Sequence, residues 1–203
     1  KPSWGWTGNK CIECCEMEIR IRNISPELKL LMILMVPVVA AMILHYILTG
    51  FVIYNDGRGY YISLRSIVID KDVDFLNEWT YFNNTHSKFS DAKRVNAVPE
   101  LKTPKGYLVN IYLIGNAIMW APFFLTAHAA ALLLNSAGLP VMADGFGPLY
   151  EASIGVANLI YGFLGIWLIY KFCRKWFDKK TALLSTIAVW YGTAVFWYHS
   201  IEP

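Results

Sequence analysis

The sequence lacks charge over long stretches. Residues 30–53, 152–170 and 181–198 contain no Asp, Glu, Lys or Arg. The formal net charge is only +3, and the basic residues are grouped locally instead of covering one face, which excludes a nucleic-acid-binding protein. Pathways for ions or solutes normally place charged residues inside membrane spans, so their absence also argues against a transporter or channel.

Cysteine is scarce as well. Of the four cysteines, Cys11, Cys14 and Cys15 lie in one short segment, and Cys173 follows an apolar run. This distribution excludes a disulfide framework and favours reduced, cytosolic thiols. The Cys-x-x-Cys-Cys cluster supplies at most half of a zinc site, because no second ligand pair lies near it.

Apolar sequence is abundant, since 56% of the residues are hydrophobic, which places the chain in the membrane class. As a helix, residues 30–53 would be about 36 Å long, enough to cross a hydrocarbon core of ~30 Å. We expect this run to stay as an anchor and not to be a cleavable signal, because about 29 residues, many of them charged, precede it. The stretch Ser25-Pro26-Glu27 predicts the helix start, with a capping hydroxyl, a proline at the first position and an acid at the positive end of the helix dipole. Pro37 predicts a kink.

Positive charge predicts the topology. Residues 171–180 and the N-terminal segment 1–29 are basic, so both are expected in the cytoplasm. Between them the chain must cross the membrane an even number of times. Residues 30–53 and 152–170 supply two strong spans, and residues 107–134 are interrupted by polar residues and proline. We therefore expect 107–134 to be interfacial or re-entrant on the outer face.

The predicted fold class is an all-α, multi-pass integral membrane protein, expected in a prokaryotic plasma membrane. It has three transmembrane helices, and the outer loop between the first two carries interfacial or re-entrant helices. The predicted membrane domain covers residues 30–203, with spans at 30–53, 152–170 and 181–198 and the outer loop at 54–151.

The first polar residues after the first span form the stretch Tyr54-Asn55-Asp56-Gly57-Arg58-Gly59-Tyr60-Tyr61. Asp56 is thus an acid placed where a membrane helix reaches water. Apolar residues at Tyr60, Leu64, Ile67 and Val68 then recur at helical spacing, which predicts an amphipathic helix lying in the interface with tyrosine rings at headgroup depth.

The alternating acids Asp70, Asp72 and Asp74 begin like a calcium-binding loop. Phe75 replaces the glycine that such a loop needs, and Tyr81 replaces its closing glutamate, so an EF-hand is excluded. A divalent metal at a site of another kind stays open.

Several of these motifs together resemble the GT-C fold glycosyltransferases, which include the protein O-mannosyltransferases and the lipid A aminoarabinose transferases. The shared features are the acid after the first span, the amphipathic segment and a Lys-Gly before an apolar interfacial helix. The resemblance covers about residues 28–203 and implies the N-terminal portion of a GT-C-like fold. It is carried by Asp56, Gly59-Tyr60-Tyr61-Ile62-Ser63-Leu64-Arg65-Ser66, Pro104-Lys105-Gly106, Asn116-Ala117-Ile118-Met119-Trp120-Ala121-Pro122-Phe123-Phe124 and His199-Ser200-Ile201-Glu202-Pro203.

The resemblance implies a membrane glycosyltransferase that moves a sugar, with inversion, from a polyprenyl-phosphate donor to an acceptor protein, lipid or glycan on the outer face. Asp56 is then the general base, and Arg58 and Lys105 are candidates to neutralise the lipid phosphate. The expected substrate-binding set is Arg58, Tyr60, Tyr61, Lys105, His199 and Glu202, with no metal ligand assigned. In the mannosyltransferases a Glu follows the acid, whereas Gly57 follows Asp56 here.

One other reading of the same residues stays open. The chain is alternatively a non-catalytic subunit that holds partner proteins in a larger membrane complex. In that case Asp56 is a solvated acid at a helix end, and Arg58 and Lys105 extend their charges to lipid headgroups.

Overall fold

The computed structural model describes residues 25–86 and 102–201, and the regular structure of these residues is helical apart from one isolated bridge between Lys102 and Leu108. The helices are α1 (Pro26–Thr49), α2 (Asp56–Arg65), the π-helix η1 (Ser66–Asp70), α3 (Leu76–His86), α5 (Gly115–Ser136), α6 (Pro148–Cys173), α7 (Lys179–Gly192) and α8 (Ala194–Ser200).

The start of α1 is the one that the sequence predicts. The side chain of Ser25 accepts a hydrogen bond from the backbone N–H of Leu28 at 3.3 Å, Pro26 is the first helical residue and Glu27 lies in the first turn. The helix ends at Gly50, whose φ of 84° is the left-handed conformation that glycine adopts without strain.

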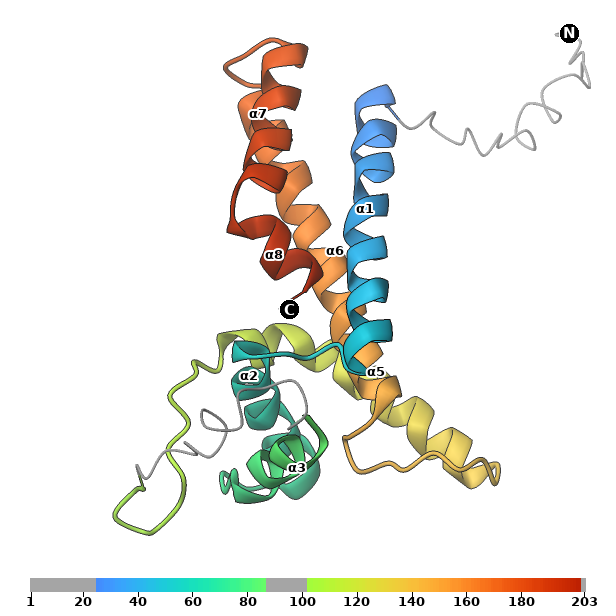
Figure 1. Ribbon diagram of the computed structural model, residues 1–203, viewed down its shortest axis with the longest axis vertical. Helices are drawn as coiled ribbons and strands as arrows, with labels where there is room; N and C mark the ends of the chain where they lie inside the picture. Colours follow the sequence, from blue (N-terminus) through green and yellow to red (C-terminus); the bar gives the residue numbers. More distant parts are fainter. Residues whose placement is uncertain (1–24, 87–101, 202–203) are drawn as a thin grey trace, which may run out of the picture.

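Helices α1, α6 and α7 stand side by side, and α2, α3 and α5 gather at their lower end (Figure 1). At the upper end, Lys179 Nζ lies 2.5 Å from a carboxylate oxygen of Glu27. At the lower end, the carboxylate of Glu151 accepts the backbone N–H of Val52 at 2.7 Å. Helices α1 and α6 are therefore antiparallel, and the described chain between them, residues 50–86 and 102–147, lies at the lower end.

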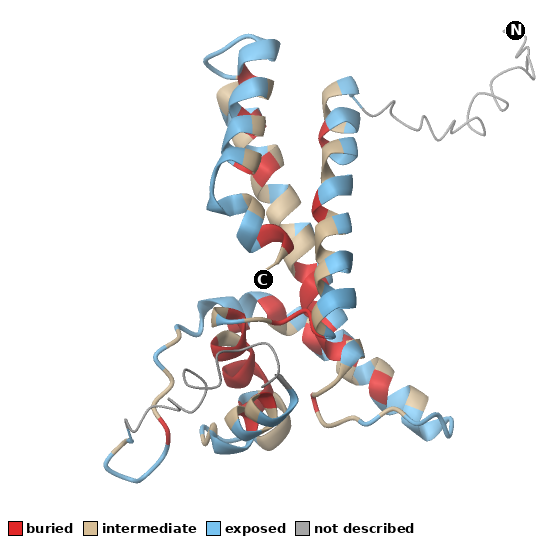
Figure 2. Ribbon diagram, viewed as in Figure 1, coloured by how far each residue is buried: buried red, intermediate tan, exposed pale blue. Residues whose placement is uncertain are grey.

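Three helices in the described part of the chain are long and apolar enough to cross a membrane: Pro26–Thr49, Gly115–Ser136 and Pro148–Cys173. The first and last confirm the predicted spans at 30–53 and 152–170. Exposed apolar side chains cover most of α1, as expected for a helix surrounded by lipid (Figure 2).

The third predicted span, residues 181–198, is wrong as a continuous helix. Helix α7 has 14 residues, which makes it about 21 Å long, shorter than a hydrocarbon core. The chain breaks at Thr193, which has extended φ and ψ of −130° and 177°, and the Thr193 side chain caps α8 by accepting the N–H of Val195 at 3.2 Å. A local side chain-to-backbone bond thus ends one helix and starts another.

Residues 107–134 begin as irregular chain and become helical only at Gly115. Helix α5 then runs obliquely across the lower ends of α1 and α6 (Figure 1). Tyr161 of α6 donates its hydroxyl to the carbonyl of Met119 at 3.1 Å, and the His128 ring lies 2.8 Å from the Tyr150 hydroxyl. Contacts along its length therefore hold α5 against the lower half of α6.

Helix α2 confirms the predicted helix but not its predicted surroundings. Eight of its ten residues are buried inside the protein, so it does not lie with one face in the headgroups. Tyr61 is only 1% exposed and donates its hydroxyl to the carbonyl of Gly145. Around it, Phe82, Phe124 and Tyr150 complete a core shared by α2, α3, α5 and α6.

The polar end of α2 is held by Arg65, which joins four segments. Its guanidinium bonds to the carboxylate of Asp70, to Glu78 Oε1 at 2.7 Å and to the carbonyl of Asp144 at 2.9 Å. It also lies 4.1 Å from the centre of the Phe146 ring. Because every one of these partners is polar or aromatic, the buried charge of Arg65 is compensated.

Glu78 is fully buried, and burial raises the pKa of its carboxyl from 4.5 to about 7 in spite of the bond from Arg65. Between these two values the folded state holds a proton that the unfolded chain has released. The contribution of Glu78 to the free energy of unfolding therefore falls as pH rises from 4.5 to about 7, and it is constant outside this window.

We predict that Glu78→Gln flattens the pH dependence of stability between about pH 5 and about pH 7. The amide keeps the oxygen that accepts from Arg65 and has no charge to desolvate. Thermal unfolding of the detergent-solubilised protein over this range measures the effect. The control is Asp72→Asn, which changes an exposed acid six positions before Glu78. Equal pH dependence in the wild type and Glu78→Gln would contradict the prediction.

Candidate functional site

A pocket of about 440 Å³ opens beside the first residue of α2. Four helices, α2, α5, α6 and α8, contribute to its wall. Its lining residues are Asp56, Gly57, Tyr60, Asn116, Met119, Trp120, Asn158, Tyr161 and Tyr198. Segments that are more than 140 positions apart in the sequence therefore meet around Asp56.

Asp56 owes its position to the turn that follows α1. Asn55, with a positive φ of 44°, reverses the chain so that α2 starts at Asp56. The carboxylate accepts a hydrogen bond from the Tyr112 hydroxyl at 3.1 Å. Burial and then the nearby negative charge of Asp56 raise the pKa of Tyr112, so the phenol keeps its proton and remains the donor.

The pocket combines aromatic faces with amides. Tyr60, Trp120, Tyr161 and Tyr198 supply rings, and Asn116 and Asn158 supply amide donors and acceptors. Among the described residues that line the pocket, Asp56 is the only charged one. Sites for small polar ligands typically combine aromatic rings, which cover the apolar face of the ligand, with amides that bind its hydroxyl groups.

The sequence-predicted residues are only partly brought together here. Asp56 and Tyr60 line the pocket, whereas Tyr61 lies in the core beneath it. His199 is buried against α6 and α7, but its neighbour Tyr198 reaches the pocket. Lys105 is exposed in a turn of the loop closed by the Lys102–Leu108 bridge, and Glu202 lies outside the described residues.

Arg58 does not line this pocket. It follows Asp56 by two positions, so it projects about 200° away around the helix. Its guanidinium is 5.2 Å from the centre of the Tyr54 ring, 5.8 Å from Phe51 and 6.0 Å from Phe82, and its side chain is 5% exposed. In this conformation Arg58 packs among aromatic rings and cannot contact a ligand beside Asp56.

Sequence reasoning missed Glu151, Tyr112, Tyr161 and Tyr198. Glu151 carries the most distinctive signal, because an acid in the first turn of an apolar span is costly to bury without partners. Its partners, the backbone N–H groups of Val52 and Ile53, are 99 and 98 positions away in the sequence, so the sequence shows no sign of them.

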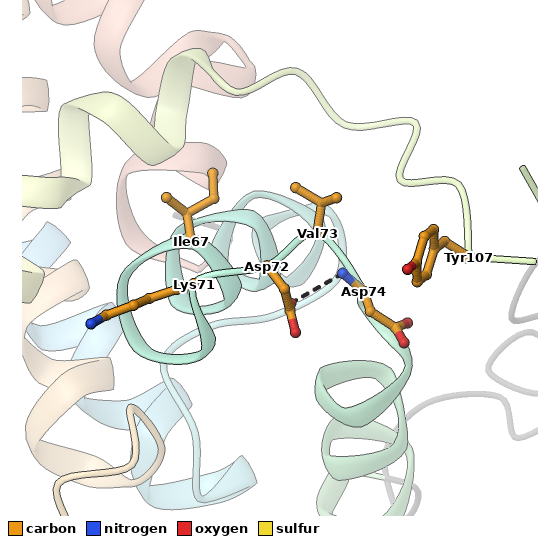
Figure 3. A pocket seen from close by; sticks show the side chains of 6 residues that line it. All are labelled: Ile67, Lys71, Asp72, Val73, Asp74 and Tyr107. Atoms are coloured by element: carbon orange, nitrogen blue, oxygen red, sulfur yellow. Dashed lines mark hydrogen bonds between the residues drawn. The ribbon is translucent and has the colours of Figure 1, made fainter. Parts of the chain in front are cut away.

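A second pocket, of about 670 Å³, lies between the end of η1 and the chain before α5 (Figure 3). Asp72 and Asp74 line it, but Asp72 already accepts the Ser66 hydroxyl at 2.8 Å and the N–H of Asp74 at 3.1 Å. Asp70 is bound instead to Arg65 and Asn77. No group of three His, Cys, Asp or Glu residues suited to a metal ion occurs in residues 25–86 and 102–201.

Gly59 makes room for the ring that holds Asp56. A Cβ atom at this position would lie 1.9 Å from the ring of Tyr112, a distance that atoms cannot adopt. We predict that Gly59→Ala displaces Tyr112 and removes its hydrogen bond to Asp56. Ultraviolet difference titration of the tyrosines should then show one phenol of lower pKa than in the wild type, since Tyr112 loses both its burial and its charged partner.

The matched control is Gly115→Ala, also in a helix, where a Cβ atom would have no neighbour within 4 Å. This variant should titrate like the wild type. A wild-type tyrosine titration in Gly59→Ala would show that Tyr112 does not depend on the glycine.

Comparison with known proteins yields no match, either to a protein-family model, to a curated protein or to a solved structure. None of these comparisons bears on the resemblance to GT-C glycosyltransferases, which stays a prediction from the motifs. In its described residues the structure shows three helices long and apolar enough to cross a membrane and a pocket that surrounds Asp56.

Proposed function

We propose that this protein is a membrane glycosyltransferase of GT-C type, in which Asp56 is the general base and the pocket around it binds the sugar of a polyprenyl-phosphate donor. The observation that carries the proposal is the lining of this pocket. A single carboxylate, steadied by Tyr112, faces four aromatic rings and two asparagine amides next to the end of a membrane span.

The chemistry requires one proton acceptor and one leaving group. As the bond between the sugar C1 and the phosphate oxygen breaks, the acceptor oxygen or nitrogen attacks C1 from the opposite face, and its proton passes to the Asp56 carboxylate. Polyprenyl phosphate leaves with the bonding electron pair, which gives inversion at C1. General-base assistance of this kind is worth about 10²–10⁴-fold in rate.

The position of α5 supports a site at the membrane surface. Chain on both sides of α5 packs at the lower end of α1 and α6: Tyr112 contacts Asp56 of α2, and the loop after α5 supplies the carbonyl that accepts from Tyr61. We therefore infer that α1 and α6 cross the bilayer and that α5 lies along its outer face, with the N-terminal segment in the cytoplasm.

The donor phosphate needs a positive charge, which none of the described lining residues provides. Lys105 is exposed in the loop that precedes α5 and is our candidate for this role. Arg58 is enclosed by aromatic rings and does not contact the donor. In the proposal its positive charge attracts the donor phosphate from a distance. His199 does not contact the donor and contributes by holding α8, and with it Tyr198, in position. Glu202, which follows Ile201 in the sequence, remains a proposed substrate-binding residue.

Membrane topology gives the first test. Single cysteines at Lys105 and Leu139, before and after α5, and at Lys175, between α6 and α7, are all at exposed positions. In a background without the native cysteines, an impermeant maleimide added outside the cells should label the first two and spare Lys175→Cys. Opposite labelling of Lys105→Cys and Leu139→Cys would mean that α5 crosses the membrane.

Activity gives the second test. Asp56→Asn should lower the rate of sugar transfer from a polyprenyl-phosphate donor by about 100-fold or more, because the amide cannot take a proton. The protein should still fold, since an amide oxygen can accept the bond from Tyr112. Transfer of radiolabelled sugar by the purified protein in nanodiscs measures the rate.

Asp72→Asn is the matched control, because Asp72 lies outside the Asp56 pocket and its amide can still accept from Ser66. It should keep wild-type transfer. Wild-type turnover by Asp56→Asn would remove the general-base assignment.

A further inference from the structure

Helix α8 reaches the pocket although it is too short to hold itself in place. It has seven residues, fewer than an isolated helix needs to be stable in solution. Its neighbours α1, α6 and α7 must therefore fix its position, and with it the ring of Tyr198 in the pocket wall.

His199 attaches α8 to both α6 and α7. Its side chain is buried, its Nδ1 accepts the indole N–H of Trp190 at 3.2 Å, and its Nε2 lies 3.3 Å from the carbonyl oxygen of Leu159. A carbonyl can only accept, so Nε2 carries the proton and the ring is neutral. The ring also stacks on Trp190, with 5.8 Å between centroids.

Helix α6 is shaped to receive this ring. At Gly162 a Cβ atom would lie 2.3 Å from His199 Nε2, so only glycine leaves space for the histidine. One turn earlier, Asn158 donates its amide to the carbonyls of Tyr198 and His199 at 2.9 and 3.1 Å. Asn158 and Tyr198 both line the pocket. A displacement of His199 would therefore also displace this part of the pocket wall.

We propose that Gly162 and His199 set the width of the Asp56 pocket, with His199 as a positioning residue that holds Tyr198 against the ligand. This deepens the proposed function, since it names the part of the molecule that determines how tightly the sugar is held. Any side chain larger than glycine at position 162 moves α8 away from α6 and opens the pocket on that side.

The structural test compares Gly162→Ala with Gly165→Ala in the full chain. Both lie in α6 and gain the same helix propensity, but a Cβ atom at Gly165 would have no neighbour within 4 Å. Spin labels on cysteines at Val195 of α8 and Leu132 of α5, both exposed, report the separation of the two helices by pulsed electron paramagnetic resonance in a background without the native cysteines.

Gly162→Ala should lengthen or broaden the distance distribution, and Gly165→Ala should reproduce the wild type. Identical distributions in all three proteins overturn the proposal. If Gly162→Ala does not fold, His199→Ala is measured in its place, since it removes the ring without adding atoms, and an unchanged distribution in that variant overturns the proposal equally.

The functional arm uses a polyprenyl-phosphate sugar as the probe. Gly162→Ala should raise KM for this donor several-fold and lower kcat less, because Asp56 is untouched, whereas Gly165→Ala should leave both constants unchanged. A lower kcat at constant KM would overturn the positioning role. If the wild type transfers no sugar, the glycosyltransferase proposal fails, and the spin-label distances still decide whether Gly162 and His199 set the pocket width.

Discussion

The hydrogen bonds from the backbone of Val52 and Ile53 to the carboxylate of Glu151 are the constraint on which the rest of the structure depends. They join the chain leaving α1 to the start of α6. The Val52 nitrogen donates to the Glu151 carboxylate at 2.7 Å and the Ile53 nitrogen donates more weakly at 3.5 Å, so the carboxylate satisfies N–H groups that would otherwise be buried unpaired. With α1 and α6 joined there, the described chain between them, residues 54–86 and 102–147, folds at one end of the two spans.

Compensation of charge explains how α2, with two arginines, is buried. Arg58 and Arg65 lie at opposite ends of the helix, and each faces a different kind of compensation. Arg65 has direct partners in Asp70 and Glu78, whereas Arg58 is surrounded by rings and attracted by the more distant charge of Glu151. Buried charges without partners cost several kcal/mol, so these surroundings determine where α2 can lie.

Sequence reasoning found what is encoded locally. The cap at Ser25, the spans at 30–53 and 152–170 and the helix after Asp56 all follow from residue type and spacing, and all are present in the structure. It failed where tertiary contacts decide. Residues 181–198 carry no charge and are mostly apolar, and nothing in their composition reveals that Thr193 ends one helix and caps the next.

The pocket was predictable at its centre and not at its walls. Asp56 is conspicuous because it is the first acid after an apolar run, and Tyr60 shares its helix. In the sequence Arg58 is an equally suitable candidate, but its place two positions further along the helix points it to the opposite side. Tyr161 and Tyr198 lie within or next to apolar runs that look uniform, so only the packing of α6 against α8 shows that they face Asp56.

Two close contacts between glycine and a ring shape this wall. Gly59 admits the ring of Tyr112, which steadies Asp56, and Gly162 admits the ring of His199, which steadies α8. Glycine costs helix stability at both places, by about 1 kcal/mol relative to alanine. At both positions glycine lowers the stability of its own helix, and in return it allows a ring from another segment to pack against the backbone. Because α2 and α8 are both short, the geometry around Asp56 depends on these tertiary contacts more than on the helices themselves.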